Sequence, residues 1–254
     1  HVYAAIKPSQ IEEKTGMHGF VLSASDLNAE GMYYYLKAAL KRQTPKYVVL
    51  EVYSFSIYNK TDAPDSLSTS YKLLDLPITD RVGFVFERIM EGKAELVYDI
   101  FPIALFHENW EKPDKFGRQN RSVDNGWFPF DEVPISYPEI LLQQASLHYF
   151  EESGMHVEAE KYFIKIVDML ERKKIPYFFL ATPYFLTNSE LPTYRYIQMY
   201  AEKNGIPFLN FTENTLLRKL DFRRKYMHDV QHVTPSGAEI VSDVLADFII
   251  NIER

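Results

Sequence analysis

Residues 158–211 read EAEKYFIKIVDMLERKKIPYFFLATPYFLTNSELPTYRYIQMYAEKNGIPFLNF, and this stretch decides the fold class. Apolar residues recur at helical spacing over Glu158–Lys173 and over Glu190–Lys203, which predicts two amphipathic helices. A short aromatic-rich run follows each helix, at Ile175–Ala181 and at Phe208–Phe211, and predicts a buried strand. Helices that alternate with strands are typical of parallel strands joined by crossover connections. The chain is therefore predicted to be α/β, a three-layer α/β/α sandwich with a mostly parallel sheet.

The same order of elements is predicted upstream and at the C-terminal end. A helix is expected over Leu27–Arg42 and a buried strand over Lys46–Phe55, while Gly19–Ala24 is a short apolar strand candidate. Near the end of the chain, Thr234 is expected to cap a helix that begins at Pro235. No repeat or linker divides the sequence, so we expect a single domain over residues 1–254.

The pattern weakens between residues 59 and 136, which we interpret as a long insertion in the sandwich. A helix is predicted over Asp80–Glu91, and a second helical piece over Ala94–Phe106. The stretch His107–Pro138 is interpreted as a long excursion over the surface. Ordered loops of that length are typical of lids and binding walls.

The composition excludes several classes of function. The 254 residues contain no cysteine, which rules out disulfides, thiolate metal ligands and a cysteine nucleophile. With 28 Lys and Arg against 35 Asp and Glu, the net charge of −7 disfavours a nucleic-acid partner, which needs clustered positive charge. No glycine-rich dinucleotide or phosphate motif occurs, so no organic cofactor is predicted. No apolar run is long enough to span a bilayer.

The segment before the last helix carries the strongest candidate chemistry. In Asp229-x-x-His232 a carboxylate can accept the Nδ1 proton of the imidazole and leave Nε2 to act as a base. Two other interpretations stay open. His232 can be a structural residue at the helix entry, or His228 and His232, four residues apart, can share a metal. Because no further ligands accompany the two histidines, no metal is predicted.

The segment Asp229–Ala238 resembles the last signature block of the SGNH (GDSL) hydrolase superfamily, in which D-x-x-H precedes Gly-Ala and the C-terminal helix. Three upstream segments are similar to other strand blocks of that superfamily, namely Tyr47–Glu51, Ile175–Phe179 with Thr182–Tyr184, and Gly205–Phe208. The resemblance covers most of the chain outside residues 59–136, and it implies a sandwich of the SGNH, flavodoxin-like type. It is closest to the extracytoplasmic bacterial branch related to the alginate O-acetyltransferases and the teichoic-acid D-alanyl transfer proteins.

This resemblance implies where the nucleophile belongs. His1-Val2-Tyr3, followed by Ile6–Pro8, is similar to what comes directly after the nucleophilic serine in that branch. The serine is therefore expected immediately before His1, with the first strand and the nucleophile loop upstream of residue 1. His1 itself becomes a candidate site residue.

The resemblance also implies an oxyanion hole. Ser25, with Ser23 beside it, falls in the block that supplies one donor, and is expected to serve the hole or a loop rather than act as the nucleophile. The next block carries an Asn in the superfamily, but here the chain continues through Tyr53-Ser54. The hole is therefore expected to use backbone N–H groups, helped by Tyr53 or Ser54.

Three aromatic residues on the excursion form a further candidate site. Trp110, Trp127 and Tyr137 are expected either to stack on sugar rings or to anchor the loop to the core, and both interpretations stay open. His107 is a secondary candidate. Glu51, a charged residue in an apolar strand, is expected either to be paired in the core or to line the site.

The resemblance implies a serine-dependent esterase or O-acyltransferase that acts on acyl, chiefly acetyl, esters of a cell-surface glycan without a metal or organic cofactor. The expected partners are an acylated carbohydrate or another ester and a membrane-bound acyltransferase. The expected location is extracytoplasmic in a bacterium, secreted or held to the membrane only through an anchor upstream of the chain. The alternative is a catalytically degenerate protein of this fold that binds glycan or assists cell-envelope assembly.

Overall fold

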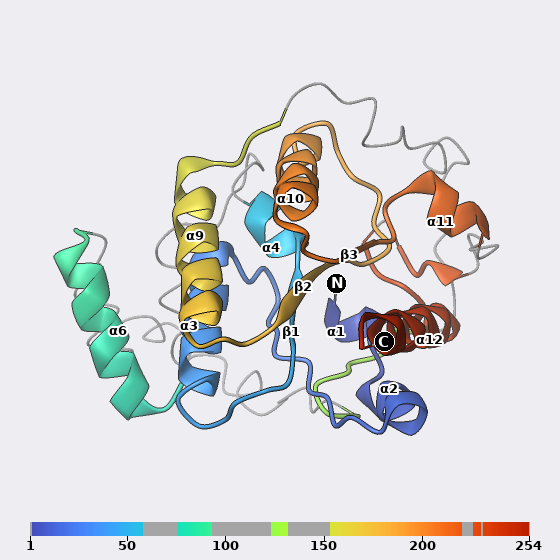
Figure 1. Cartoon of the computed structure of the whole chain (residues 1–254), viewed down its shortest axis with the longest axis horizontal. Helices are drawn as coiled ribbons and strands as arrows, with labels where there is room; N and C mark the ends of the chain where they lie inside the picture. The colour runs from blue at the N-terminus through green and yellow to red at the C-terminus, as the bar shows by residue number, and fades with distance from the viewer. Residues whose placement is uncertain are drawn as a thin grey trace, which may run out of the picture.

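The computed structural model describes residues 2–57, 76–92, 123–131, 153–219, 226–229 and 231–253. Within these residues the chain forms a mixed α/β structure around an open sheet of three parallel strands (Figure 1). The strands β1 (Val48–Glu51), β2 (Tyr177–Ala181) and β3 (Phe208–Asn210) lie in the order β1-β2-β3. The α/β class and the parallel sheet are therefore confirmed.

Nine helices are described around this sheet. They are α1 (Val2–Ala5), α2 (Pro8–Thr15), α3 (Ala29–Ala39), α4 (Tyr53–Ser56), α6 (Ile78–Met90), α9 (Val157–Arg172), α10 (Leu191–Asn204), α11 (Asn214–Lys219) and α12 (Pro235–Ile252). The helices predicted before β1, before and after β2, within the insertion and at the C-terminal end correspond to α3, α9, α10, α6 and α12. The apolar periodicity predicts these helices because each helix buries one stripe of apolar side chains against the rest of the protein.

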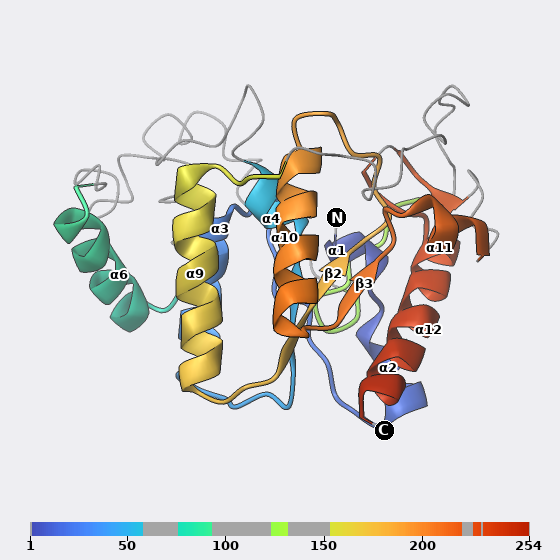
Figure 2. The same cartoon turned by 45° about the horizontal axis from the view of Figure 1, so that its top comes forward.

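One face of the sheet is covered by α3, α9 and α10, with α9 and α10 side by side (Figures 1 and 2). Successive side chains of β2 point to opposite faces, so Phe179 and Ala181 enter this cluster. The ring of Phe163 on α9 stacks on Phe179 with centroids 5.9 Å apart. This face forms the larger of the two main core clusters.

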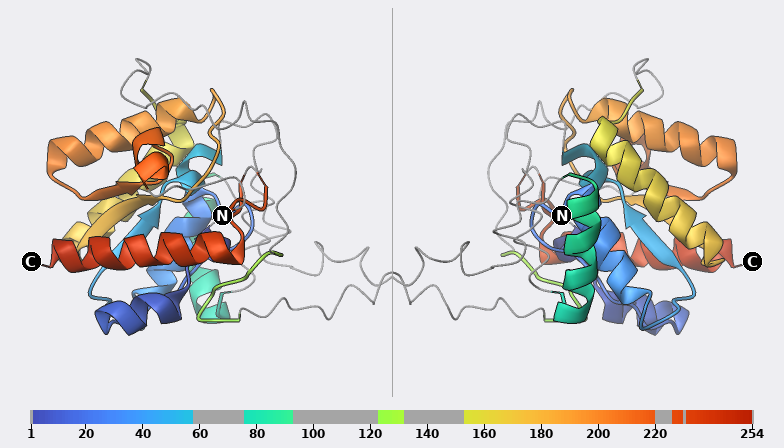
Figure 3. Two further views of the ribbon diagram at one scale, coloured as in Figure 1. Left: turned by 90° about the vertical axis from the view of Figure 1, so that its right-hand side faces the viewer. Right: turned by 90° about the vertical axis from the view of Figure 1, so that its left-hand side faces the viewer.

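The opposite face is covered by α12 together with α1 and α2 (Figure 3). Phe178 and Leu180 of β2 point to this side, and Phe178 meets Phe248 of α12 edge to face at 5.4 Å. The predicted cap of α12 is confirmed, since Thr234 Oγ1 accepts the amide of Gly237 at 3.2 Å. The segment that contains Asp229 and His232 therefore leads directly into a well-packed helix.

The predicted strand Lys46–Phe55 is too long at both ends. In the structure β1 ends at Glu51, and the chain turns at once into α4. The Glu51 carboxylate accepts the backbone amide of Tyr53 at 2.9 Å, which supports the first turn of that helix. The apolar pattern continues through this turn, because the turn is held by a side-chain carboxylate and not by a change in hydrophobicity. The predicted end of the strand at Phe55 is therefore four residues too late.

The prediction of a strand over Gly19–Ala24 is wrong. No strand is formed there, and the amide of Val21 instead donates to the carbonyl of Asn125 at 2.9 Å. Phe20 and Leu22 are 66% and 42% exposed, although an apolar strand in a sheet would bury them. The physical reason is that no described strand lies beside this segment.

Two of the predicted segments lie wholly or mostly outside the described residues. These are the helical piece Ala94–Phe106 and the excursion His107–Pro138, of which only residues 123–131 are described. Of the helices that the structure describes, none combines the length and apolarity needed to cross a membrane.

Candidate functional site

Asp229 and His232 lie in a tight loop that leads into α12. An isolated antiparallel bridge closes the loop. Inside it the amide of His228 donates to the carbonyl of His232 at 2.8 Å, and the amide of Thr234 donates to the carbonyl of Tyr226 at 2.9 Å. These backbone bonds fix the distance between the aspartate and the histidine.

The loop also requires glycine at position 237. A Cβ atom on Gly237 would lie 2.3 Å from the carbonyl oxygen of Tyr226. That oxygen already accepts the amide of Thr234, so it cannot move away without loss of this hydrogen bond. The glycine of the motif therefore has a steric explanation in this chain.

We expect Gly237→Ala to destabilise the protein by about 1–3 kcal/mol, the range typical of overpacked sites. Gly83→Ala is the matched control. It lies inside α6, where an added Cβ meets nothing within 4 Å, and alanine favours a helix interior by roughly 0.5–1 kcal/mol. Urea unfolding measures both variants. Equal stability of the Gly237 variant and the native protein would contradict the steric argument.

The two side chains form a hydrogen-bonded pair. Nδ1 of His232 lies 2.8 Å from Oδ2 and 3.0 Å from Oδ1 of Asp229. Oδ1 also accepts the backbone amides of Gln231 at 2.6 Å and of His232 at 2.7 Å. Because an ionised carboxylate only accepts, His232 donates from Nδ1, and its Nε2 carries the lone pair that can accept a proton.

Electrostatics favour the protonation states that a general base needs. Burial lowers the pKa of His232 below its ordinary value, and the bond to Asp229 opposes this shift only in part. Burial acts to raise the pKa of Asp229, but the bonds from His232 and from the amide of Gln231 outweigh it, so this pKa is lowered. At neutral pH the imidazole is therefore neutral and the carboxylate ionised.

Tyr3 supplies a hydroxyl on the far side of the imidazole. Its Oη lies 3.3 Å from Nε2 of His232. Burial raises the pKa of Tyr3, while a hydrogen bond with Ser25 acts in the opposite direction. The phenol therefore stays protonated at neutral pH. From the sequence, Tyr3 is only a neighbour of the expected serine, because no pattern in the sequence indicates a contact between residues 229 positions apart.

A loop from the insertion covers the pair. Phe130, in the described segment 123–131, lies with its ring centroid 4.4 Å from that of His232. The same ring stacks on His228 at 4.9 Å and lies 6.2 Å from Tyr3. This residue was not predicted individually, but it belongs to the excursion that was interpreted as a lid or binding wall.

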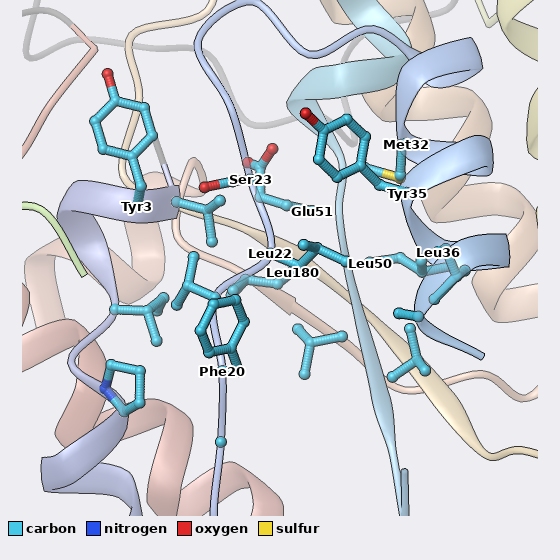
Figure 4. A pocket seen from close by; sticks show the side chains of 18 of the residues that line it. Tyr3, Phe20, Leu22, Ser23, Met32, Tyr35, Leu36, Leu50, Glu51 and Leu180 are labelled. Carbon is cyan, nitrogen blue, oxygen red and sulfur yellow. The ribbon is translucent and has the colours of Figure 1, made fainter. Parts of the chain in front are cut away.

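A cavity of about 850 Å³ opens beside these groups (Figure 4). It lies between the segment 17–27 and β1, and most of the side chains that line it are apolar. Tyr3 and His232 line it at the carboxyl edge of the sheet, and Lys46 lines it near the start of β1. The pair therefore faces a cavity at the edge where ligands bind in open α/β sheets.

The structure brings most of the predicted site residues together. Ser25, Tyr53 and Ser54 line the same cavity as His232. Ser25 is exposed, whereas Tyr53 and Ser54 are buried in α4. Ser23 also lines the cavity, and in Figure 4 it lies between Tyr3 and Glu51. His1 lies outside the described residues.

The geometry narrows the choice of oxyanion donors. The backbone amide of Tyr53 donates to Glu51 at 2.9 Å, so it is not available to a substrate oxyanion. Burial raises the pKa of Tyr53, and its ring meets Tyr184 edge to face at 5.3 Å. The Ser54 hydroxyl makes no hydrogen bond with another residue that the structure describes. Ser54 is therefore the better placed of the two predicted donors.

Both interpretations of Glu51 apply at once. Its carboxylate is buried and accepts from the amide of Tyr53 and from the hydroxyl of Thr182, the latter at 3.2 Å. It also lines the cavity. Burial raises the pKa of Glu51 to about 7, so a fraction of this carboxyl is protonated near neutral pH.

Trp127 does not join the cavity lining. Its indole N–H donates to the carbonyl of Ala4 at 3.0 Å, and the Lys7 ammonium lies 5.0 Å from the ring centroid. These contacts attach the loop 123–131 to α1, which is the anchoring role. Trp110, Tyr137 and His107 lie outside the described residues.

The proposed sharing of a metal by His228 and His232 would need further ligands. Among the described residues, no group of three or more His, Cys, Asp or Glu side chains could hold a metal ion. The rings of His228 and His232 both lie against Phe130, at centroid distances of 4.9 and 4.4 Å.

The chain was compared with protein-family models, with curated proteins and with solved structures, and no match was found in any of the three.

Proposed function

We propose that this chain is a serine-dependent esterase or O-acyltransferase of the SGNH type, built as a three-layer α/β/α sandwich. The observation that carries the proposal is the Asp229–His232 pair, whose imidazole lines a cavity at the carboxyl edge of a parallel sheet. The resemblance of Asp229–Ala238 to the SGNH signature adds the expected nucleophile, a serine immediately before His1. The proposed substrate is an acyl, chiefly acetyl, ester of a glycan outside the cytoplasm.

The proposed reaction uses the pair as a base and then as an acid. The serine oxygen attacks the acyl carbonyl, its proton passes to Nε2 of His232, and the carbonyl electrons move onto the oxygen. Collapse of this intermediate breaks the ester bond, and the leaving alkoxide takes the proton from Nε2. Water or a sugar hydroxyl then repeats the sequence on the acyl-serine. Asp229 holds the imidazole in the required tautomer throughout.

Two observations favour a second candidate, a degenerate protein of the same fold that binds glycan or assists envelope assembly. The Tyr3 hydroxyl is positioned against Nε2, where a nucleophile would have to approach. The amide of Tyr53 is already bonded to Glu51, which removes one oxyanion donor. Loss of one such donor commonly costs about 10²–10³ in rate. The two candidates differ in whether a serine becomes covalently modified.

We expect a serine-directed fluorophosphonate to label the protein that includes the native residues before His1, at the serine next to His1. Mass spectrometry of the labelled peptide identifies the site, and His232→Ala should slow the labelling because the base is lost. Saturable binding of an acetylated oligosaccharide without any labelling would overturn the esterase proposal and support the second candidate. Labelling of Ser25 or Tyr3 would identify that residue as the nucleophile in place of a serine before His1.

A further inference from the structure

We propose that Tyr3 is a catalytic residue that relays protons between His232 and the hydroxyl group that attacks the acyl carbon. Ser25 is the positioning residue that holds the Tyr3 hydroxyl in this role. The relay rests on the proposed function, because it requires a hydroxyl to deprotonate. The hydrogen bonds that form it do not, and they can be tested without catalysis.

The direction of these hydrogen bonds follows from the protonation of His232. Since Nδ1 donates to Asp229, Nε2 can only accept, so the Tyr3 hydroxyl 3.3 Å away donates to it. The single proton of that hydroxyl is then in use, and Ser25 is the donor in the hydrogen bond between Ser25 and Tyr3. The result is a chain that runs from Ser25 through Tyr3 and His232 to Asp229. Its bond at 3.3 Å is long, as catalytic hydrogen bonds often are before substrate binds.

The Tyr3 oxygen offers a route to the base that needs no displacement of Tyr3. Nε2 of His232 has a single lone pair, and the Tyr3 hydroxyl is bonded to it. The Tyr3 oxygen has two lone pairs, of which Ser25 uses one. The second can accept a hydrogen bond from an attacking hydroxyl in the cavity, which Tyr3, Ser25 and His232 all line. A proton can therefore reach Nε2 through Tyr3.

The loop 123–131 fixes both the backbone and the ring of Tyr3. The carbonyl of Tyr3 accepts the amide of Phe128 at 2.7 Å, and the two rings meet edge to face with centroids 6.5 Å apart. The ring centroid of Phe130 lies 6.2 Å from that of Tyr3. In Figure 4 the ring of Tyr3 rises from α1, and its hydroxyl points away from the apolar side chains of the cavity. Removal of the ring from Nε2 would break these contacts, which favours a relay over a side chain that swings aside.

Each passage of protons through the relay leaves Tyr3 neutral. As the attacking oxygen forms its bond to the acyl carbon, its proton moves to the Tyr3 oxygen, and the proton of Tyr3 moves to Nε2. This step produces an imidazolium and a tetrahedral oxyanion. When the oxyanion collapses, Nε2 returns a proton to Tyr3, and Tyr3 gives its own proton to the leaving alkoxide. Because burial raises the pKa of Tyr3, a phenolate is disfavoured and the two transfers occur together.

Tyr3→Phe distinguishes a relay from a hydroxyl that only obstructs Nε2. In the protein that carries the proposed nucleophile, loss of the relay should lower kcat for a small acetyl ester by about 10²-fold and change KM little. Tyr196→Phe is the matched control and should leave kcat unchanged. Its hydroxyl also bonds to one side chain, the carboxylate of Glu160 at 2.8 Å, but Tyr196 does not line the cavity. A kcat of Tyr3→Phe equal to or above the native value would overturn the relay and leave the proposed function standing.

Solvent isotope effects separate a proton relay from a purely structural role of Tyr3. Single-turnover acylation is measured in mixtures of light and heavy water. Since two protons move together in the native protein, the rate should depend on the deuterium fraction as a quadratic curve, and in Tyr3→Phe as a straight line. Ser25→Ala should lower the rate less than Tyr3→Phe, and Ser25→Thr, which keeps a hydroxyl, should restore it. A straight line in the native protein would overturn the relay.

Nitrogen NMR of the His232 ring tests the hydrogen bonds without catalysis. In Tyr3→Phe the Nε2 resonance should move toward that of an imidazole nitrogen that accepts no hydrogen bond. Ser25→Ala should move it less and in the same direction, because Ser25 acts through Tyr3. An unchanged resonance in Tyr3→Phe would overturn the relay, whatever the result of serine labelling. The expected shifts without labelling or turnover would instead refute the proposed function and, with it, the catalytic role of Tyr3.

Discussion

If the proposed serine precedes His1, replacement of His232 by alanine is expected to lower the turnover of a small acetyl ester by about 10³-fold or more in the protein that carries it. Among the described residues, His232 combines an imidazole that lines the cavity with a carboxylate bonded to its Nδ1. Without it the serine proton has no acceptor, and catalysis retains only binding and oxyanion stabilisation. Single-turnover release of acetate from a chromogenic ester measures the effect.

His228→Ala is the matched control for this variant. His228 lies in the same loop, and its ring stacks on the same Phe130, but the Asp229 carboxylate bonds to the ring of His232. Loss of His228 therefore removes comparable packing and leaves the base in place, so activity should stay within a few-fold of the native value. If both variants lose activity equally, or if His232→Ala keeps full turnover, the catalytic role of His232 is refuted. Thermal unfolding of both variants detects a loss of folding.

The pair itself was predictable because its geometry is local. Asp229, His232 and the cap at Thr234 lie within six residues, and a short loop with backbone hydrogen bonds fixes their distances. The contacts of Tyr3 and Phe130 with His232 were not predictable. They join α1, the insertion and the C-terminal loop through packing alone, and no periodicity or spacing in the sequence reports such contacts.

The errors in the fold prediction have a similar cause. The helices were found because each one buries an apolar stripe that has a fixed period. A strand depends in addition on what lies beside it. Gly19–Ala24 has the apolar composition of a strand but no described neighbour to pair with, and β1 ends early because Glu51 bonds to the amide of Tyr53. Neither a missing neighbour nor a side-chain cap is visible in an apolar pattern.

Asp229→Asn is expected to lower kcat/KM by about 10²–10⁴-fold at neutral pH. An amide presents either its oxygen or its NH₂ group to Nδ1. Since the backbone amides of Gln231 and His232 already require an acceptor at Oδ1, the NH₂ group would face the imidazole. The ring would then take the opposite tautomer, with its proton on Nε2, and would no longer serve as a base toward the cavity.

The pH profile separates this effect from a simple change of charge. In the native protein kcat/KM should rise as His232 loses its proton, with a midpoint below the ordinary histidine value because burial lowers the pKa of His232. Asp229 opposes that shift, so its removal lowers the pKa of His232 further. The rising limb of the variant should therefore move to lower pH, and the rate loss should persist on the alkaline plateau, where both proteins carry a neutral imidazole.

Asp26→Asn, which removes the same charge from an exposed residue on the cavity wall, is the control and should change kcat/KM by less than about threefold. A rising limb of the variant that moves to higher pH would show that Asp229 does not raise the pKa of His232. A plateau of the variant equal to the native one would show that Asp229 does not orient the imidazole.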